Sequence, residues 1–368
     1  MDQFAMKTRI FMGSFALKEL DKLKTKRTMI ICDPFMEKSG TVRRIADPLE
    51  AGGACVSVFS EVVPDPDIHI VSKGIGALLE CGPDTLIALG GGSALDTAKA
   101  VRYIYEQQYP DREKICLVAV PTTSGTGSEV TSFAVISDRE KNVKFPLRDD
   151  SMLPDIALLA PELTVTVPPS ITADTGMDVL THAVEAYVSI RHCDFSDAFA
   201  EKAMKIVLEY LETAVKDGSS LEVRERLHNA SCLAGVAFNS ASLGLCHAMA
   251  HALGGEFHIP HGRANAMLLA HTVAFNAQTA RERYLELAKV MGISETSGNI
   301  AIFQLTRKIG GLRERVGIPG KITDCGIDRE DFLAAVPKMA AAALQDACLE
   351  TNPRKPNQGE IEEIYRKL

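Results

Sequence analysis

Short apolar runs rich in β-branched residues alternate with helical patterns in the first part of the chain. These runs predict buried strands at 27–33, 55–62, 85–92 and 115–123, and the first of them ends in a polar residue, Asp33. Between the runs, apolar positions recur about every 3.6 residues, as at 70–81 and 93–105, which predicts helices. Strands that alternate with helices favour a parallel sheet covered on both faces.

The pattern changes near the middle of the chain. SFAVISD and VKFPL predict a β-hairpin or an edge, and 155–163 predicts one more buried strand. After VPPS (167–170) the long stretches are alanine-rich and have helical periodicity, so we expect no strand beyond Pro168. The sequence therefore predicts an α/β domain at 1–168 and an all-helical domain at 169–368.

Composition narrows the class of protein. The chain has 368 residues, 46% hydrophobic and 24% charged, which is typical of soluble globular proteins. The net charge of -8, without a Lys/Arg block, argues against a nucleic-acid or anionic-membrane surface. No apolar run is long enough for a membrane span, and the first residues lack a signal-peptide pattern. The nine cysteines are scattered without a C-x-x-C pair, which predicts reduced thiols and a cytoplasmic location.

A triple glycine, Gly90 to Gly92, lies between a predicted strand and a predicted helix. Glycines there let the backbone approach a phosphate, and the helix N-terminus supplies N–H donors. Ser93 is expected to cap that helix. The spacing is not G-x-G-x-x-G, so a tight turn without a ligand explains this motif alone equally simply.

A second loop, PTTSGTGSEVT (121–131), also follows a predicted strand. Two polar glycine loops at the carboxyl ends of parallel strands fit a nucleotide across the sheet edge, although a Ser/Thr-rich surface loop is the alternative. Asp33 ends the first strand. Its carboxylate either accepts hydrogen bonds from a ribose, which favours NAD over NADP, or simply caps a helix.

Four of the nine histidines lie within HAMAHALGGEFHIPH (247–261). His247 and His251 are spaced i, i+4, as are Asp178 and His182 upstream, so each pair shares one face of a helix. One carboxylate and several imidazoles suit a divalent metal such as Fe(II), Zn or Mn. The spacing does not say which histidines bind metal, and the donor set does not select Fe(II) over Zn.

These motifs resemble those of the iron-dependent (group III) alcohol dehydrogenases along essentially the whole chain. The shared stretches are GGGSALDTAKA, PTTSGTGSEVT, TGMDVLTHAVEAYVS, HAMAHALGG and PHGRANAMLL. PDPDIH, HNASCLAG, GGEFHIPHG and NPR resemble the branch of this family that reduces propanal in propanediol-utilisation microcompartments. Arg263 departs from several relatives, which carry a smaller apolar residue, so the mouth of the site is expected to differ.

The resemblance implies roles for particular residues. The metal ligands implied are Asp178, His182, His247 and His261. His251 is implied as a catalytic proton-relay residue beside the nicotinamide, whereas His258 has no general family role and is expected to line the pocket or be structural. The cofactor-binding positions implied are Asp33, Asp65, Gly91, Gly92, Ser93, Thr122, Thr123, Thr126 and Lys144. The implied fold is dehydroquinate synthase-like, with a Rossmann-like first domain, a helical second domain and an active site in the cleft.

The implied activity is interconversion of short-chain aldehydes and primary alcohols, with propanal and 1-propanol as the expected pair and ethanol or lactaldehyde as alternatives. The implied cofactors are NAD(H) and Fe(II), with Zn also able to bind the isolated protein. A homodimer is expected, in the cytoplasm or inside a bacterial microcompartment, with an aldehyde dehydrogenase or another microcompartment protein as partner.

Three other classes remain open at this point. Zinc glycerol dehydrogenases and dehydroquinate-synthase-like lyases share the architecture but not the full motif set. A metallohydrolase would need a glutamate base within the H-x-x-x-H pair, and HAMAH has none. A non-catalytic microcompartment protein would not need intact ligands and both glycine loops.

Overall fold

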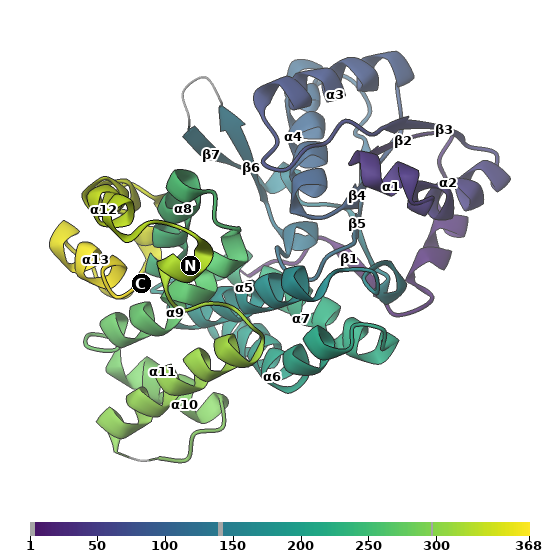
Figure 1. The fold of residues 1–368 in the computed structure, drawn as a ribbon. Coiled ribbons are helices and arrows are strands. Elements are labelled where there is room, and N and C mark those ends of the chain that lie inside the picture. The colour runs from purple at the N-terminus through teal and green to yellow at the C-terminus, as the bar shows by residue number, and fades with distance from the viewer. Residues whose placement is uncertain (1–3, 139–142, 296) are drawn as a thin grey trace. The chain divides into compact units, whose positions relative to one another are not determined.

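The computed structural model describes residues 4–138, 143–295 and 297–368, without the side chains of 138 and 143–146. The chain divides into two compact units, Met1–Thr166 and Val167–Leu368 (Figure 1). The boundary lies two residues before the position predicted from the change in sequence pattern.

The first unit is built on a six-stranded parallel sheet with the order β1-β8-β5-β4-β2-β3. Its strands are β1 (Arg9–Met12), β2 (Arg27–Cys32), β3 (Cys55–Phe59), β4 (Thr85–Gly90), β5 (Cys116–Pro121) and β8 (Ile156–Leu159). In the centre of the sheet Ile30 pairs with Ile87, and Ile87 pairs with Val118. All three side chains are fully buried, because helices cover both faces.

Alternate residues of β2 enter different cores. Met29 and Ile31 pack with α3 (Ile68–Cys81) and α4 (Gly92–Gln108) on one face. Ile30 and Cys32 pack with α2 (Thr41–Ala51) on the other face. This double burial explains why β2 reads as a continuous apolar run rather than as an alternating one.

The strand order reverses between β2 and β4. From β2 the chain goes to the edge strand β3 and then returns to β4 on the opposite side of β2. In open α/β sheets, ligands bind at such a reversal, beyond the carboxyl ends of the strands. The short α1 (Pro34–Lys38) follows β2 there, and α4 follows β4.

The predicted strands and the predicted hairpin are present. β6 (Phe133–Asp138) and β7 (Val143–Arg148) pair antiparallel as a separate sheet, and β8 matches the run predicted at 155–163. The sequence analysis missed β1, a four-residue edge strand whose partner β8 lies nearly 150 residues away. The expected helix cap at Ser93 is wrong, because α4 begins at Gly92 with Gly91 as its N-cap residue.

The second unit contains helices and no strand among its described residues. The helices are α5 (Pro169–Val188), α6 (Asp194–Lys216), α7 (Leu221–Ala241), α8 (Leu245–Phe257), α9 (His261–Asn276), α10 (Arg281–Val290), α11 (Gly298–Arg315), α12 (Arg329–Leu344) and α13 (Gln358–Tyr365). Nearly all of α5 is buried beneath α6, α7 and α9 (Figure 1).

The described residues show the state of the cysteines and the length and composition of the helices. All nine cysteines are free thiols. No single helix in the described ranges is long and apolar enough to cross a membrane; only α7 and α8 taken together, with a bend of 107° between them, reach that length and composition.

Candidate functional site

Four potential metal ligands converge in the helical unit. Asp178 and His182 lie one turn apart on α5, His247 lies on α8, and His261 is the first residue of α9. One ligand atom from each lies within 4.8 Å of the other three. The Oδ1 atom of Asp178 is 3.7 Å from Nε2 of His247 and 3.6 Å from Nε2 of His261. The structure thus brings together the four residues that the family resemblance implied as ligands.

The polar atoms of this cluster are only partly satisfied by protein groups. Nε2 of His247 and Nδ1 of His182 are buried and have no hydrogen-bond partner. Burial raises the pKa of the Asp178 carboxyl, but the imidazoles of His182, His261 and His247 outweigh it, so the pKa is lowered and the group is a carboxylate. A buried imidazole nitrogen facing a carboxylate and two more imidazoles fits a divalent cation, which would bind the nitrogen's lone pair and share the carboxylate's charge.

Glu185 contacts the four-donor cluster through His247. It lies three residues after His182 on α5 and is 4% exposed. Its Oε2 atom lies 2.5 Å from Nδ1 of His247, and its carboxylate accepts hydrogen bonds from the backbone N–H groups of Gly244 (3.1 Å) and Cys246 (2.6 Å). One carboxylate therefore orients the His247 ring and holds the first turn of α8.

The start of α9 is pressed against α5. A Cβ atom added at Gly262 would lie well inside contact distance of the Asp174 carbonyl oxygen, so only glycine allows this approach. Asn265 donates from Nδ2 to Oδ1 of Asp178 at 2.8 Å. Arg263 makes two 3.1 Å hydrogen bonds to the carboxylate of Asp174, one turn before Asp178. Arg263 and Asp174 thus form an ion pair beside the expected ligands.

The other two histidines of the motif have different surroundings. His251 lies beside the four-donor cluster, with its ring stacked on that of His261 at a centroid distance of 5.2 Å. Its Nδ1 atom lies 2.7 Å from Oδ2 of Asp346. His258 is exposed and ends α8 as its C-cap residue, in the left-handed conformation (φ 56°).

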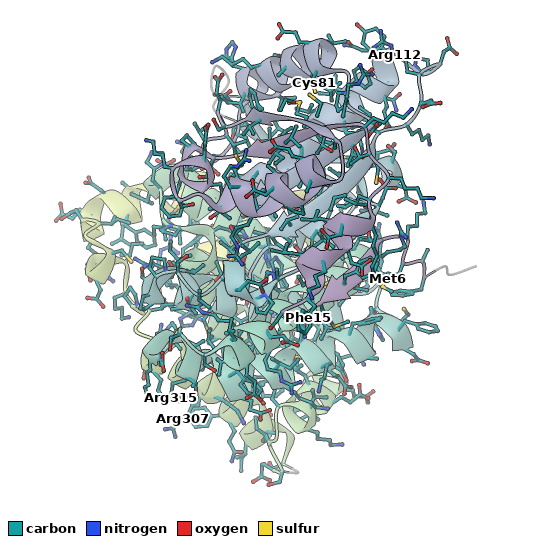
Figure 2. All side chains as sticks on the ribbon, turned by 90° about the vertical axis from the view of Figure 1, so that its right-hand side faces the viewer. Met6, Phe15, Cys81, Arg112, Arg307 and Arg315 are labelled. Atoms are coloured by element: carbon teal, nitrogen blue, oxygen red, sulfur yellow. The ribbon has the colours of Figure 1, made fainter. Side chains whose placement is uncertain are left out.

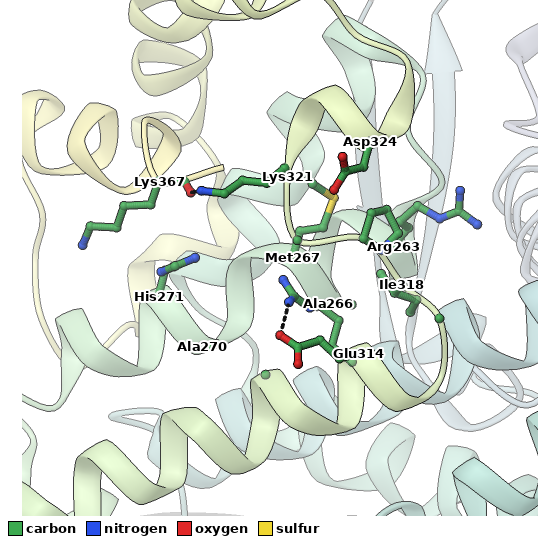
Figure 3. Close-up of a pocket in the computed structure, with 15 residues that line it drawn as sticks. Arg263, Ala266, Met267, Ala270, His271, Glu314, Ile318, Lys321, Asp324 and Lys367 are labelled. Atoms are coloured by element: carbon green, nitrogen blue, oxygen red, sulfur yellow. Dashed lines mark hydrogen bonds and ion pairs between the residues drawn. The ribbon is translucent and has the colours of Figure 1, made fainter.

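A cavity in the described part of the helical unit is a separate feature. It measures about 880 Å³, lies between α9, α11 and the segment 317–324, and none of the four donors lines it (Figure 3). His271 faces it, and burial together with Lys367, Arg313 and Lys321 lowers the pKa of His271 to about 4. Neutral His271 and the paired Arg313 and Glu314 make this a mixed polar surface without a concentration of ligand atoms.

In the first unit the two glycine loops meet at the reversal of strand order. The backbone N–H of Thr122 donates to the Gly90 carbonyl at 2.9 Å. A Cβ atom at Gly91 would lie 3.3 Å from Oγ1 of Thr123, and one at Gly92 would lie 2.7 Å from Cγ2 of Thr126. The bare backbone at the N-terminus of α4 and the threonines of the second loop therefore form one polar cradle for a phosphate.

Asp33 lies at the same sheet edge, at the end of β2. Its Oδ1 atom accepts hydrogen bonds from the backbone N–H groups of Phe35 (2.8 Å) and Met36 (3.2 Å), so Asp33 caps α1. The other oxygen, Oδ2, points toward Gly90, 3.6 Å from where a Cβ atom would be. The cap leaves one carboxylate oxygen directed at the glycine turn, so the two interpretations of Asp33 are compatible.

The remaining expected cofactor positions are less informative. Ser93 is the second residue of α4 and is partly buried beside Gly92. Asp65 is exposed in the loop between β3 and α3, with a left-handed backbone (φ 52°). Lys144 lies on β7, and its side chain lies outside the described residues.

Comparison with known proteins decides the family. A model of the iron-containing alcohol dehydrogenases matches residues 7–161, and a model of the C-terminal part of the Fe-containing alcohol dehydrogenase family matches 172–368. The chain belongs to the iron-containing alcohol dehydrogenase family. It is therefore an oxidoreductase, and the resemblance proposed from the sequence motifs is confirmed.

Individual members of the iron-containing alcohol dehydrogenase family are similar over their full length. The 1-propanol dehydrogenase PduQ of Salmonella typhimurium is 48% identical, covering 100% of both chains. The NADPH-dependent butanol dehydrogenase of Clostridium saccharobutylicum is 38% identical, over 99% of this chain and 97% of that protein.

Solved structures with similar sequences have the same fold. An alcohol dehydrogenase from Oenococcus oeni is 34% identical, with a TM-score of 0.93 over 100% of this chain and 99% of that one. The sulfoacetaldehyde reductase of Bifidobacterium kashiwanohense, solved in complex with NAD+, is 29% identical, with a TM-score of 0.89 over 100% and 98%.

Sequence reasoning missed Glu185, Asn265 and Asp346. Glu185 follows His182 by three residues, so helical spacing places it close to the face that carries the ligands, and this signal could have found it. Asn265 follows His261 by four residues and shows the same signal. Asp346 has no comparable signal, because it lies 95 residues from the histidine it contacts.

Proposed function

We propose that this protein is an NAD(H)-dependent and iron-dependent alcohol dehydrogenase that interconverts propanal and 1-propanol, together with similar short-chain aldehydes and primary alcohols. The observation that carries the proposal is the cluster of one carboxylate and three imidazoles, of which all but His261 are buried, with Glu185 at Nδ1 of His247. Full-length identity of 48% to a 1-propanol dehydrogenase supports the choice of substrate.

Each part of the site has a definite task in this proposal. Bound iron would supply the Lewis acid that polarises the substrate oxygen, and bound NADH would supply the hydride. Asp178, His182, His247 and His261 hold the metal. Glu185 accepts the Nδ1–H of His247 and so directs the lone pair of Nε2 into the cluster.

His251 is the proton-relay residue in this proposal. The Asp346 carboxylate contacts Nδ1 of His251, so Nε2 is the nitrogen that donates and accepts the proton. Its side chain is 38% exposed, so a proton exchanged at Nε2 reaches bulk water directly. Burial opposes ionisation of Asp346, but the hydrogen bond and the charge of His251 lower the pKa of Asp346 to about 2, so this partner stays a carboxylate.

The cofactor preference is proposed from Asp33. A carboxylate beside the glycine turn accepts hydrogen bonds from the ribose hydroxyl groups and repels the additional phosphate of NADP. The NAD+ complex of the related sulfoacetaldehyde reductase supports NAD(H). The NADPH-dependent butanol dehydrogenase shows that the family includes the other preference, so NADPH is the second candidate.

We also propose a homodimer that pairs through β1. This strand is an edge of the sheet, and Met6, Met12 and Phe15 around it are 54%, 60% and 72% exposed. Met6 and Phe15 are labelled in Figure 2. An unpaired edge flanked by apolar side chains favours association with a second copy.

The expected location is the cytoplasm, inside a microcompartment with an aldehyde dehydrogenase that shares the aldehyde.

The first experiment measures NADH oxidation at 340 nm with propanal and anaerobically purified, Fe(II)-loaded protein. NADPH and a Zn-loaded preparation are run beside it. Rapid turnover with NADH and Fe(II) supports the proposal. Binding of NADH without turnover of any short-chain aldehyde, with either metal, would contradict it and direct the search to polyol or lyase substrates.

A further inference from the structure

One turn of α4 carries a buried lysine and a partly buried aspartate that contact the second glycine loop. The ammonium group of Lys99, which is 0% exposed, donates to the Thr131 carbonyl at 3.0 Å, to Oγ1 of Thr131 at 3.1 Å and to the Phe133 carbonyl at 2.7 Å. An ammonium has three N–H donors, and all three are accepted by this one segment.

Asp96 contacts the same segment on either side of those residues. Its Oδ1 accepts the hydroxyl of Ser128 at 2.6 Å, and its Oδ2 accepts the backbone N–H of Val135 at 2.9 Å. Asp96 and Lys99 are spaced i, i+3, so they share one face of the helix, with Oδ1 and Nζ 3.9 Å apart. Together they make five hydrogen bonds to the segment 128–135.

The second glycine loop is therefore held at two places. At its start Thr122 donates to the carbonyl of Gly90, the last residue of β4, and Thr126 packs on Gly92, the first residue of α4. At its end Asp96 and Lys99 hold the chain as it leaves toward β6. The second attachment therefore limits how far the threonines of the first one can move from the N-terminus of α4.

We propose that Asp96 and Lys99 are positioning residues for the dinucleotide, which hold the second glycine loop at a fixed distance from the N-terminus of α4. This inference rests on the proposed use of NAD(H). Burying an ammonium is costly unless its donors are filled and a carboxylate is near. An apolar residue at 99 would fill the space without fixing the register of the loop.

The charge on Lys99 is maintained at neutral pH. Burial lowers the pKa of Lys99 to about 8. The nearby Asp96 and Glu129 raise the pKa and so offset part of this effect. The ammonium form therefore predominates at pH 7, and the three hydrogen bonds of Lys99 are charge-assisted.

The test compares NADH binding by the Fe(II)-loaded protein and by Lys99→Met and Thr131→Val variants. Thr131→Val is nearly isosteric and removes a single acceptor of Lys99, so it keeps the test usable if Lys99→Met does not fold. Binding is measured by calorimetry and by the fluorescence of bound NADH. We expect the Kd and KM for NADH to rise at least tenfold in Lys99→Met and at least threefold in Thr131→Val, with KM for propanal within twofold.

Leu78→Ala is the matched control, since Leu78 is fully buried on α3 in the same unit. It should lower Tm without changing the Kd for NADH. If Thr131→Val and every folded Lys99 variant bind NADH within twofold of the wild type, the inference is wrong. Failure of the wild-type protein to bind NADH would instead refute the proposed function.

Discussion

Oε2 of Glu185 lies 2.5 Å from Nδ1 of His247, and both side chains are almost completely buried. The carboxylate also accepts backbone N–H groups at the start of α8. The orientation of an expected metal ligand and the position of its helix therefore depend on the same acidic side chain.

Glu185→Gln should weaken metal binding. The amide cannot accept the Nδ1–H of His247 and the backbone N–H groups as strongly as a carboxylate does, so the ring loses its fixed orientation. Such partners typically contribute about 10- to 100-fold in metal affinity. Anaerobic titration with Fe(II) or Co(II) measures the change, and Glu363→Gln, on the exposed surface of α13, is the control. Equal affinity in both variants would contradict the role of Glu185.

His251→Ala should retain metal but slow turnover. His251 stands beside the four donors, and general acid–base groups typically contribute about 10²- to 10⁴-fold, so we expect kcat to fall by about 100-fold. Asp346→Asn should cause a smaller decrease, of about tenfold, because the amide no longer selects one tautomer of His251. Metal content by elemental analysis separates the two roles: loss of metal from His251→Ala would make it a ligand. The His258→Asn variant should keep the wild-type turnover and metal content, because asparagine is suited to the left-handed C-cap position.

Asp33→Ser should change the cofactor preference without unfolding the helix. Serine keeps the N-cap of α1 but removes the negative charge beside the glycine turn. We expect KM for NADH to rise and the ratio of kcat/KM for NADPH to that for NADH to increase by about tenfold, which is about 1.4 kcal/mol. Asp67→Ser, at the N-cap of α3, is the matched control. An unchanged ratio would reduce Asp33 to a helix cap.

Gly262→Ala should disturb the metal cluster through packing. The added methyl collides with the Asp174 carbonyl, and His261 precedes it directly, so α9 must move away from α5. Overpacking of this kind costs about 1–3 kcal/mol. Urea denaturation and metal titration should both show a loss. Gly255→Ala, on α8 with nothing within 4 Å, should be neutral or stabilising; the same result at Gly262 would refute the close-approach argument.

Glu129→Gln should flatten the pH dependence of stability. Burial raises the pKa of Glu129 to about 7. A hydrogen bond from its own backbone N–H and the charge of Lys99 lower the pKa, but they do not outweigh burial. Between about pH 4.5 and 7 the folded protein keeps a proton that the unfolded chain releases, so the free energy of unfolding falls as the pH rises, by up to about 3 kcal/mol. Urea denaturation at pH 5 and pH 8 measures this difference. The exposed Glu80→Gln variant should keep the wild-type slope, and an identical slope in Glu129→Gln would contradict the assignment.

The local elements and much of the site chemistry were readable from the amino-acid pattern. The apolar runs at β2, β4 and β5 are readable because both of their faces are buried, and the hairpin of β6 and β7 is local. The pairs Asp178 with His182 and His247 with His251 are readable because helical spacing is a local property. The family motifs then supplied roles that spacing alone left open.

The three-dimensional fold was needed to show which residues from distant parts of the chain meet. It paired β1 with β8, brought Asp346 to His251, and joined Glu185 to His247. It also showed that Asp96 and Lys99 hold the second glycine loop. The physical reason is that periodicity records which side of an element is buried, but not which partner covers it. That choice depends on how helices and strands pack, and no single stretch of sequence contains it.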